Sequence, residues 1–483
     1  MLRIYNTLTR KKQAFRPLHD DKVGLYTCGI TAYYYPHIGN MRKYVMDDVL
    51  KRVLMHDGYT VEHIENVTDV GHLAGDANTT DDKMRVSAEK QQKTMKQVAE
   101  FYFDIFRNDS ERLDILPPTK FLFASEHIGE MLELIGKLDA RGYLYKIGSG
   151  MYFDTSKFRS YGELTGSTFK RLNEQLRAGA RVERVEGIKN ITDFAVWRFA
   201  EGKDMIWDSK WGRGFPGWHI ECSAMSMGAL GEQFDIHTGG VDHVAIHHSN
   251  EIAQSEAATG HKFVDYWVHH EFLVVNGQKM SKSIGNVYTV QQIIDMGHNP
   301  LALRLFYMSG HYRQMLNFTF EALKNTENTL GGIYAFIGRM AEVKNTKKNV
   351  DAPEFRKRVG EARKAFFKSL DDDINTPEAL AHMHALVNEA NQRAASGKLS
   401  RAEAMAVIKA MLDFDEVLGL RFADHATANK APLEEDIQKL VDAREAARKA
   451  KDFKKADEIR DVLRQKHHIT LEDTPGGVKW HKA

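Results

Sequence analysis

The chain has 483 residues, 42% hydrophobic and 28% charged, an ordinary balance for a soluble globular protein of several domains. The 67 basic and 66 acidic residues give a net charge of +1, so overall charge indicates no partner and nucleic-acid binding would need a local basic face. No apolar run has signal-peptide or membrane-span length, and two cysteines cannot cross-link such a chain, so we expect a cytoplasmic protein without a membrane partner.

The first 70 residues predict a strand, a helix and a second strand. Polar and apolar residues alternate over 22–28 and again over 58–70, as in half-buried strands. Between them, 41–57 carries valines four residues apart, as in a buried helix face. A βαβ unit of this kind indicates an α/β fold with a parallel sheet, whose ligands bind at the carboxyl ends of the strands. We expect three side chains at that edge: Cys28, His37 and Thr68.

The middle of the chain reads as an insertion followed by the return of the sheet. Residues 126–141 form an amphipathic pattern, and 143–158 are typical of a hairpin. We interpret 125–210 as an inserted unit with its own small sheet. Strand-like patterns return at 234–240 and 264–275, which predicts that the first sheet resumes there.

The C-terminal part is predicted to be helical. The pattern is helical over 289–344, and further helices follow a linker and run to about Gly419. A second linker at 423–436 precedes a tail with two helices and a short hairpin at 469–480. We expect this tail to fold as a separate unit.

The sequence His37-Ile-Gly-Asn40 lies between the first strand and its helix. A small loop with Gly39 at the start of a helix lets a phosphate approach backbone N–H groups, and the helix dipole adds partial positive charge. His37 could donate to a phosphate oxygen. Taken alone, these four residues are equally typical of a surface histidine before a helix.

The sequence Lys279-Met-Ser-Lys-Ser283 is more specific. A fixed five-residue match arises by chance with a probability on the order of 10⁻⁴ in a chain of this length. Two lysines on a loop can place ammonium groups on a triphosphate and stabilise a pyrophosphate leaving group. The alternative is a solvated lysine loop.

Several scattered residues could bind a metal. His247 and Glu251 are four residues apart, so they share one face of a helix, and the cysteines Cys28 and Cys222 would complete a tetrahedral zinc set. His248 competes with His247 but would point about 100° away from the face that carries Glu251. Two buried cysteines and a helix-end histidine without metal remain an alternative on spacing alone.

The sequence Gly239-Gly240-Val241-Asp242 ends the strand that begins at 234. Glycine there allows a flat adenine or ribose to approach the backbone, and the aspartate could accept hydrogen bonds from ribose hydroxyls.

Taken together, these segments resemble the cysteinyl-tRNA synthetases, a class I family of cysteine–tRNA ligases. The resemblance covers nearly the whole chain. His37-Ile-Gly-Asn40 looks like the family's HIGH motif and Lys279–Ser283 like its KMSKS motif. Residues 218–225 and 247–257 are similar to intervening blocks, and the tail is similar to the C-terminal tRNA-binding module.

The resemblance implies an α/β fold: a Rossmann-like parallel-sheet catalytic domain with an inserted connective domain, a helical anticodon-binding region and a small α+β tail. The implied catalytic domain lies in two halves, 1–124 and 211–288, with the connective domain at 125–210 between them. A helical stem-contact region at 289–350 and a tRNA-binding helical bundle at 351–424 follow. The last division, 425–483, is a linker with the anticodon-recognition module.

The resemblance also implies a site. Each chain would hold one Zn²⁺, and Mg²⁺ would accompany ATP. The implied metal ligands are Cys28, Cys222, His247 and Glu251. The implied catalytic residues are His37, Asn40, Lys279 and Lys282. The implied ATP contacts are His37, Gly39, Asn40, Gly240, Asp242 and Lys282. The implied contacts to the substrate cysteine are Gly29, Thr31, Thr68 and Trp218.

The implied reaction joins L-cysteine to ATP as cysteinyl-adenylate and then transfers the cysteinyl group to the 3′ end of tRNA(Cys). We expect the protein to be a monomer. Zinc would select cysteine over serine, because an apolar pocket separates such a pair by only about 1–3 kcal/mol whereas zinc binds the thiolate directly.

The chain departs from the family pattern in three places. The family usually has an acidic residue at Tyr34 and a glutamate at Ser249, and this chain carries an insertion at 71–81 near the active-site rim. Independently of these departures, two alternative functions stay open. One is a zinc-dependent ligase that joins cysteine to a small amine, and the other is a non-catalytic tRNA-binding paralogue.

Overall fold

The computed structural model describes residues 1–70, 93–178, 185–201, 205–281, 284–345, 352–426, 435–450, 452–467, 469–474 and 477–482. The predicted insertion at 71–81, residues 346–351 of the first predicted linker, residues 427–434 of the second and Lys282 lie outside these residues. The chain divides into two compact units. The first comprises Met1–Gln291, Tyr307–Thr319 and Lys368–Pro377, and the second comprises Gln292–Phe306, Phe320–Phe367 and Glu378–Ala483.

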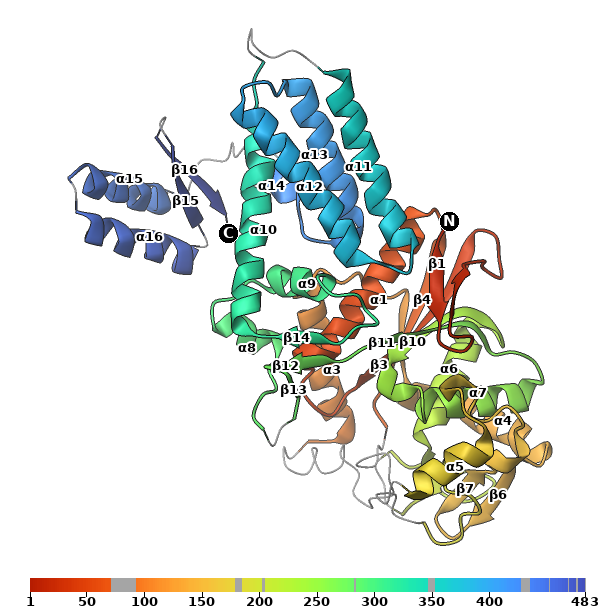
Figure 1. Cartoon of the computed structure of the whole chain (residues 1–483). Coiled ribbons are helices and arrows are strands. Elements are labelled where there is room, and N and C mark those ends of the chain that lie inside the picture. Colours follow the sequence, from red (N-terminus) through yellow and green to blue (C-terminus); the bar gives the residue numbers. More distant parts are fainter. Residues whose placement is uncertain are drawn as a thin grey trace. The chain divides into compact units, whose positions relative to one another are not determined.

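A five-stranded parallel sheet is the centre of the first unit (Figure 1). Its strand order is β11-β10-β3-β4-β5, and every adjacent pair is parallel. The bounds are Lys22–Thr31 for β3, Thr60–Thr68 for β4, Lys120–Phe123 for β5, Phe234–Gly240 for β10 and Val264–His270 for β11. The predicted βαβ unit is confirmed, since α1, Ile38–His56, connects β3 to β4.

The strand order changes direction between β3 and β10. From β3 the chain proceeds to β4 and β5 on one side, and later returns to β10 and β11 on the other. In open parallel sheets, ligands bind at the carboxyl ends of the strands next to such a switch point. Cys28 near the end of β3 and Gly240 at the end of β10 therefore lie on the two sides of the expected site.

Helix α1 forms because one face is apolar. The valines predicted to be inside, Val45, Val49 and Val53, are all buried, as are Leu50 and Leu54. The other helices of this region are α3, Met95–Arg112, α4, Ile128–Ala140, α6, Trp218–Leu230, and α7, His247–Thr259. Helix α6 packs against both α4 and α7.

A second, antiparallel sheet of order β6-β7-β8-β9 lies within and just after the predicted insertion. Its strands are Leu144–Ile147, Gly150–Phe153, Phe194–Phe199 and Gly214–Pro216. The predicted hairpin is β6–β7. Strand β9 follows the predicted boundary at 210. The short helix α5 is Phe169–Ala178.

Small strands complete the first unit. Strands β1, Arg3–Asn6, and β2, Lys11–Ala14, form an N-terminal hairpin. Strands β12, Leu273–Val275, β13, Gln278–Lys279, and β14, Leu316–Phe318, form a three-stranded sheet. The prediction of unbroken helix over 289–344 was wrong at β14, because a three-residue strand is too short to show a period of two.

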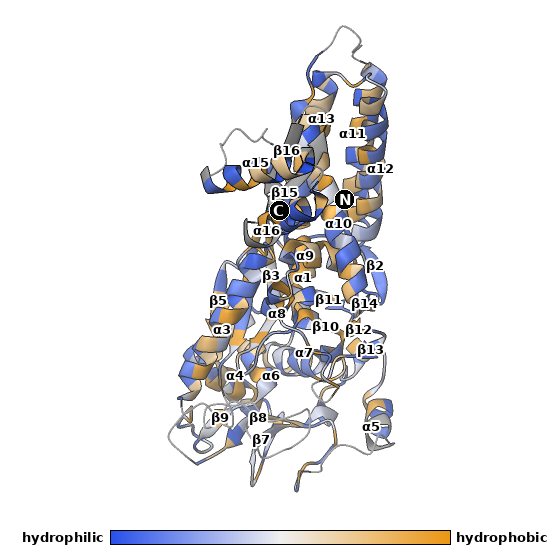
Figure 2. Ribbon diagram, turned by 90° about the vertical axis from the view of Figure 1, so that its left-hand side faces the viewer, coloured by the Kyte–Doolittle hydropathy of each residue, from blue (hydrophilic) through white to orange (hydrophobic). Residues whose placement is uncertain are grey.

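Helices dominate the second unit. Their bounds are α8, Val290–Asp295, α9, Pro300–Met308, α10, Phe320–Glu342, α11, Pro353–Asp371, α12, Thr376–Ala395, α13, Arg401–Leu418, and α14, Ala423–Ala426. Figure 2 shows hydrophobic and hydrophilic residues on each of α11, α12 and α13, as bundle helices require. No helix in the described part of the chain is long and apolar enough to cross a membrane.

The tail contains the predicted two helices and hairpin. Helices α15, Glu435–Lys449, and α16, Phe453–His467, precede strands β15, Ile469–Thr474, and β16, Gly477–Lys482. Ile437 and Val441 lie buried on the predicted face of α15. On α16, Ala456 of the predicted face is buried and Ile459 is partly buried against this cluster. The next buried residue is Leu463 rather than the predicted Val462, which is only partly buried.

Candidate active site

A pocket of about 410 Å³ opens at the carboxyl edge of the parallel sheet. It is lined by the end of β3, the start of α1, the ends of β10 and β11, and the first residues of the 279–283 motif. The predicted site residues that line it are Cys28, Gly29, Thr31, His37, Gly39, Asn40, Gly240, Asp242 and Lys279. Residues far apart in the sequence therefore share one cavity.

A β-bulge sets the direction of Cys28. The pairing of β3 with β4 shifts register between Thr27 and Ile30, which places Cys28 and Gly29 in the irregular part of the strand. Gly29 must be glycine, since a Cβ there would lie 1.7 Å from the Asn66 carbonyl oxygen. The Asn66 side chain accepts a hydrogen bond of 2.7 Å from the Gly29 N–H. Bulges often redirect a side chain next to an active site.

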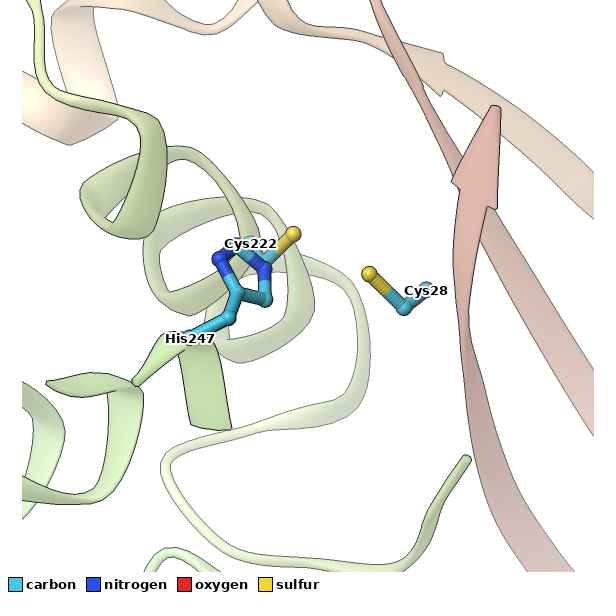
Figure 3. Close-up of side chains that lie close together, drawn as sticks. All are labelled: Cys28, Cys222 and His247. Atoms are coloured by element: carbon cyan, nitrogen blue, oxygen red, sulfur yellow. The ribbon is translucent and has the colours of Figure 1, made fainter. Parts of the chain in front are cut away.

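Cys28, Cys222 and His247 form the core of a potential metal site (Figure 3). Their donor atoms all lie within 4.8 Å of one another, and all three residues are buried. Figure 3 shows the two sulfurs facing each other, with the His247 ring beside Cys222. The residues come from β3, α6 and the first position of α7.

Glu251 is placed next to this cluster by the helical spacing of α7. Its Oε1 lies 3.0 Å from His247 Nε2 and 3.9 Å from His248 Nε2. Its Oε2 contacts His237 Nε2 at 2.9 Å. A second donor group, Cys28 with His243 and His248, shares Cys28 with the first, and a third, His237 with His248 and Glu251, shares His248 with the second. Sequence reasoning did not include His237 or His243, which no spacing rule connects to the cysteines.

The donor set fits a metal ion. His247 Nε2 and Glu251 Oε1 are buried 3.0 Å apart in a geometry that does not form a hydrogen bond, a costly arrangement unless another ligand satisfies them. Two sulfurs, an imidazole nitrogen and a carboxylate oxygen form a set that zinc binds in proteins. These four residues would therefore hold the metal.

The electrostatics of the cluster favour an anionic sulfur. A hydrogen bond from the Cys222 thiol, together with His243 and His247, lowers the pKa of Cys28 well below its usual value, although burial opposes this. Burial also acts against the charged form of Glu251, but the neighbouring His237 and His247 outweigh it and lower the pKa of that carboxyl group.

His37 is the N-cap of α1. Its Nδ1 accepts a hydrogen bond of 3.2 Å from the Asn40 N–H, and Asn40 Oδ1 accepts one of 3.1 Å from the His37 N–H. This reciprocal capping box fixes the loop geometry. When Nδ1 of a neutral histidine accepts, the proton resides on Nε2, which can then donate to a ligand oxygen.

The start of the 279–283 motif is held by Asn286. Its side-chain oxygen accepts from the Ser281 N–H at 2.8 Å, and its amide donates to the Lys279 carbonyl at 3.2 Å. The Lys279 side chain is exposed and lines the pocket. Lys282 lies outside the described residues.

Two predicted substrate contacts lie away from the lining of this pocket. Thr68 is buried, and its hydroxyl donates to Glu221 Oε2 at 3.0 Å. The Trp218 ring centroid lies 4.3 Å from that of His247. Trp218 therefore neighbours the metal-site residues, whereas the Thr68 hydroxyl is engaged by a carboxylate. The Asp242 side chain lies close to Gly240, since a Cβ atom added at Gly240 would be 2.2 Å from Asp242 Oδ1.

Sequence reasoning missed two basic residues near the start of α1, the buried Arg42 and the pocket-lining Lys43. Arg42 donates to the carbonyls of Glu271, Phe272, His311 and Gln314 at 2.7–3.1 Å. Lys43 donates to Asp47 at 3.1 Å and to the Cys28 carbonyl at 2.7 Å. The only signal was polar residues at positions that helical periodicity turns inward.

The sequence matches three families in chain order. Residues 14–328 match the family described as tRNA synthetases class I (C) catalytic domain. Residues 365–423 match the DALR domain, and residues 431–480 match the cysteinyl-tRNA ligase anticodon binding domain.

Full-length relatives carry one name. The chain is 41% identical over 509 residues to a protein of Treponema denticola named cysteine–tRNA ligase, with 100% of this chain and 99% of that protein covered. It is 42% identical over 491 residues to a Thermococcus gammatolerans protein of the same name, with the same coverage.

Solved structures with the same fold are more distant. A Mycobacterium tuberculosis methionyl-tRNA synthetase in complex with methionyl-adenylate aligns with a TM-score of 0.61 at 16% identity, covering 84% of this chain and 91% of that one. An Agrobacterium radiobacter LeuRS in a ternary complex with tRNA and LeuAMS aligns with a TM-score of 0.62 at 10% identity, covering 86% of each. At these identities the likeness concerns the fold, which is the predicted α/β class.

Proposed function

The chain belongs to the cysteine–tRNA ligase family of class I aminoacyl-tRNA synthetases, and on this premise we propose that it activates L-cysteine with ATP and transfers it to the 3′ end of tRNA(Cys), with zinc selecting the substrate thiolate. The observation that carries the proposal is a buried sulfur and imidazole cluster that shares Cys28 with a pocket at a helix N-terminus. The sulfur and imidazole cluster suits a thiol substrate, and the helix N-terminus suits a phosphate.

Cys28, Cys222, His247 and Glu251 are the proposed holders of zinc. When bound, zinc would supply a metal–sulfur bond to cysteine that serine cannot form, and would favour the thiolate. Gly29 and Thr31 line the pocket beside Cys28 and are proposed to contact the rest of the amino acid. We propose that the Trp218 ring packs against the side chain of the substrate. For Thr68 we propose an indirect role through Glu221, given its hydroxyl bond.

The start of α1 is proposed to bind ATP. The Met280 methyl group lies 2.0 Å from where a Cβ of Gly39 would be, so this flexible side chain would move when a phosphate approaches the helix N-terminus. The His37 ring can donate from Nε2 while Asn40 holds the loop. Gly240 and Asp242, on the opposite side, are proposed to contact the nucleoside. Mg²⁺ would accompany the triphosphate.

The first chemical step is an in-line displacement. A carboxylate oxygen of cysteine forms a bond to the α-phosphorus, the bond from that phosphorus to the bridging oxygen breaks, and pyrophosphate leaves with the electron pair. Lys279 and Lys282 would stabilise the charge on the leaving group. In the second step, a terminal ribose hydroxyl of tRNA attacks the cysteinyl carbonyl, and AMP leaves.

The partner that completes the reaction is proposed to be tRNA(Cys). The helical region from 351 and the tail that matches an anticodon-binding domain would hold it. We propose that the protein acts as a monomer. We propose the domain boundaries that the resemblance implies, namely 1–124, 125–210, 211–288, 289–350, 351–424 and 425–483.

The test is ATP–pyrophosphate exchange with each amino acid in turn. Cysteine should support exchange, and the kcat/KM for serine should be lower by more than about 200-fold, beyond what an apolar pocket achieves. Comparable exchange with serine would refute thiolate selection. A charging assay with tRNA then separates this function from the small-molecule ligase. Cysteine-dependent exchange without any charging would favour that ligase, and no exchange at all would favour the non-catalytic paralogue.

A further inference from the structure

Lys43 lies in the pocket between the two proposed substrate sites. It is on α1, one turn after the His37–Asn40 loop, and lines the same cavity as Cys28 and Asn40. Its side chain is only 13% exposed. A lysine ammonium is therefore enclosed where an anionic amino acid and a triphosphate would meet.

The Lys43 ammonium is held by acceptors on two sides. Its Nζ donates to the Cys28 carbonyl at 2.7 Å and to Asp47 Oδ2 at 3.1 Å. The other oxygen of Asp47 contacts His270 Nε2 at 2.7 Å, and His270 also lines the pocket. An ammonium has three donors, and the Lys43 Nζ also lies over the Tyr44 ring, 3.9 Å from its centroid. Tyr44 lines the same pocket, so an anionic ligand can replace this weaker cation–π contact.

The hydrogen bond from Lys43 to the Cys28 carbonyl does not require a charged side chain. A neutral donor could bond to the Cys28 carbonyl, whereas enclosing an ammonium carries a desolvation penalty of several kcal/mol. Asp47 offsets part of that penalty, and burial acts against its ionised form, yet Lys43 and His270 keep the pKa of its carboxyl group below the usual value. Asp47 also contacts His270 through its other oxygen, so Lys43 shares its counter-ion with a second residue of the pocket.

We propose that Lys43 binds the anionic groups that react with each other, namely the carboxylate of the amino acid and the α-phosphate of ATP. This inference rests on the proposed function. Both groups carry negative charge and repel as they approach, and a fixed cation beside them lowers the barrier to forming the carboxylate–phosphorus bond. Lys43 transfers no proton in this step. It adds a second lysine to Lys279, which lines the same cavity.

The same helix provides a matched control. Lys51, two turns later, is also buried, and its Nζ donates to the Pro117 carbonyl at 2.7 Å. It is not among the residues that line the pocket. Lys51→Met therefore measures the general cost of removing a buried lysine from α1, and Lys43→Met adds the loss of the pocket charge.

The experiment compares ligands with and without the anionic group in the full-length zinc-loaded protein. Calorimetry gives the affinity for cysteine and for cysteamine, which lacks the carboxylate. Inhibition of exchange gives the affinity for AMP and for adenosine, which lacks the phosphate. We expect Lys43→Met to weaken at least one charged ligand by about 10- to 100-fold, as for loss of a charged hydrogen bond, and to leave its uncharged counterpart unchanged. The pair that responds identifies the group bound.

Three outcomes would overturn the proposal. They are unchanged affinities, equal losses for charged and uncharged ligands, and the same losses in Lys51→Met. Equal losses would mean that Lys43 acts only by placing Cys28, and zinc content would then fall as well. Lys43→Gln, which keeps a neutral donor for the Cys28 carbonyl, gives the same test if Lys43→Met does not fold. Absence of cysteine-dependent exchange in the wild type would instead refute the proposed function.

Discussion

The pocket of the parallel sheet and the C-terminal tail are built in opposite ways. In the pocket, the functional side chains come from distant segments and are fixed by buried contacts, such as Lys43 to the Cys28 carbonyl and Glu251 to His237. The tail packs around Ile437, Val441 and Leu463, and charged side chains such as Lys454 and Lys455 are exposed. We therefore expect that removing a single functional group from the pocket strongly impairs metal binding or catalysis. The tail should instead contribute to tRNA affinity through the sum of its exposed charges.

The largest effect is expected from a metal ligand. Cys222→Ala removes a buried sulfur from the proposed zinc site. Zinc affinity should fall by more than about 100-fold, because loss of outer contacts alone costs 10–100-fold. The KM for cysteine should rise with it. Metal analysis and exchange kinetics check this result. A zinc-free variant with full activity would remove the metal from the proposed function.

Lys282→Ala should lower the kcat of exchange by about 100-fold with little change in the affinity for cysteine. The reason is that its charge matters most as pyrophosphate leaves, and loss of one prepared donor costs about 10²–10³ in kcat. ATP–pyrophosphate exchange assays at saturating cysteine measure this kcat. Lys364→Ala, at an exposed position of α11, is the control. An unchanged kcat in Lys282→Ala would exclude this lysine from the mechanism.

Acid should destabilise the sheet through His63. This residue is buried on β4, its Nε2 lies 3.0 Å from Thr27 Oγ1, and burial lowers its pKa to about 3. A histidine with a lowered folded pKa contributes stability above its unfolded pKa of about 6.5 and loses it as pH falls towards 3. Between pH 7 and pH 5 the loss is about 2 kcal/mol.

Urea titrations at both pH values test this expectation. The wild type should lose about 2 kcal/mol more of its unfolding free energy than His63→Gln on acidification. His261→Gln, at a side chain that is 49% exposed, should behave like the wild type. Equal pH dependence in the wild type and His63→Gln would contradict the role of burial.

The sequence predicted regular elements and missed irregular ones. The spacing of Val45, Val49 and Val53 and the alternation in 22–28 identified the βαβ unit, because periodicity reports burial directly. The three-residue strand β14 and the bulge at Cys28 leave no periodic signal. In the site, motifs and the resemblance identified residues that line the pocket, such as His37 and Lys279.

Contacts between distant segments were beyond sequence reasoning. The bond between Lys43 and Cys28, and that between Asp47 and His270, join residues 15 and 223 positions apart. No local pattern encodes such a pair, since each partner alone reads as an ordinary polar residue. His237, which contacts Glu251, was missed for the same reason.

The smallest effect, and the sharpest test of the comparison, is expected from the tail. Truncation after Lys430 removes α15, α16 and the final hairpin but leaves the pocket complete. Cysteine-dependent exchange should be unchanged, while the KM for tRNA in the charging reaction should rise by about tenfold, equivalent to about 1.4 kcal/mol. Exchange and charging assays on the same preparation separate the two effects.

The ionic-strength dependence of charging then distinguishes a phosphate-binding tail from a merely structural one. Basic side chains at Arg448, Lys454 and Lys455 are exposed, but Asp457 and Glu458 are interleaved with them. If the basic side chains contact tRNA phosphates, each contact adds to the slope of affinity against salt, so the full-length protein should lose more affinity with added salt than the truncated one. Identical slopes would mean that the acidic neighbours cancel the basic ones and that the face is only solvated. Unchanged charging after truncation would show that tRNA recognition, like the chemistry, resides outside the tail.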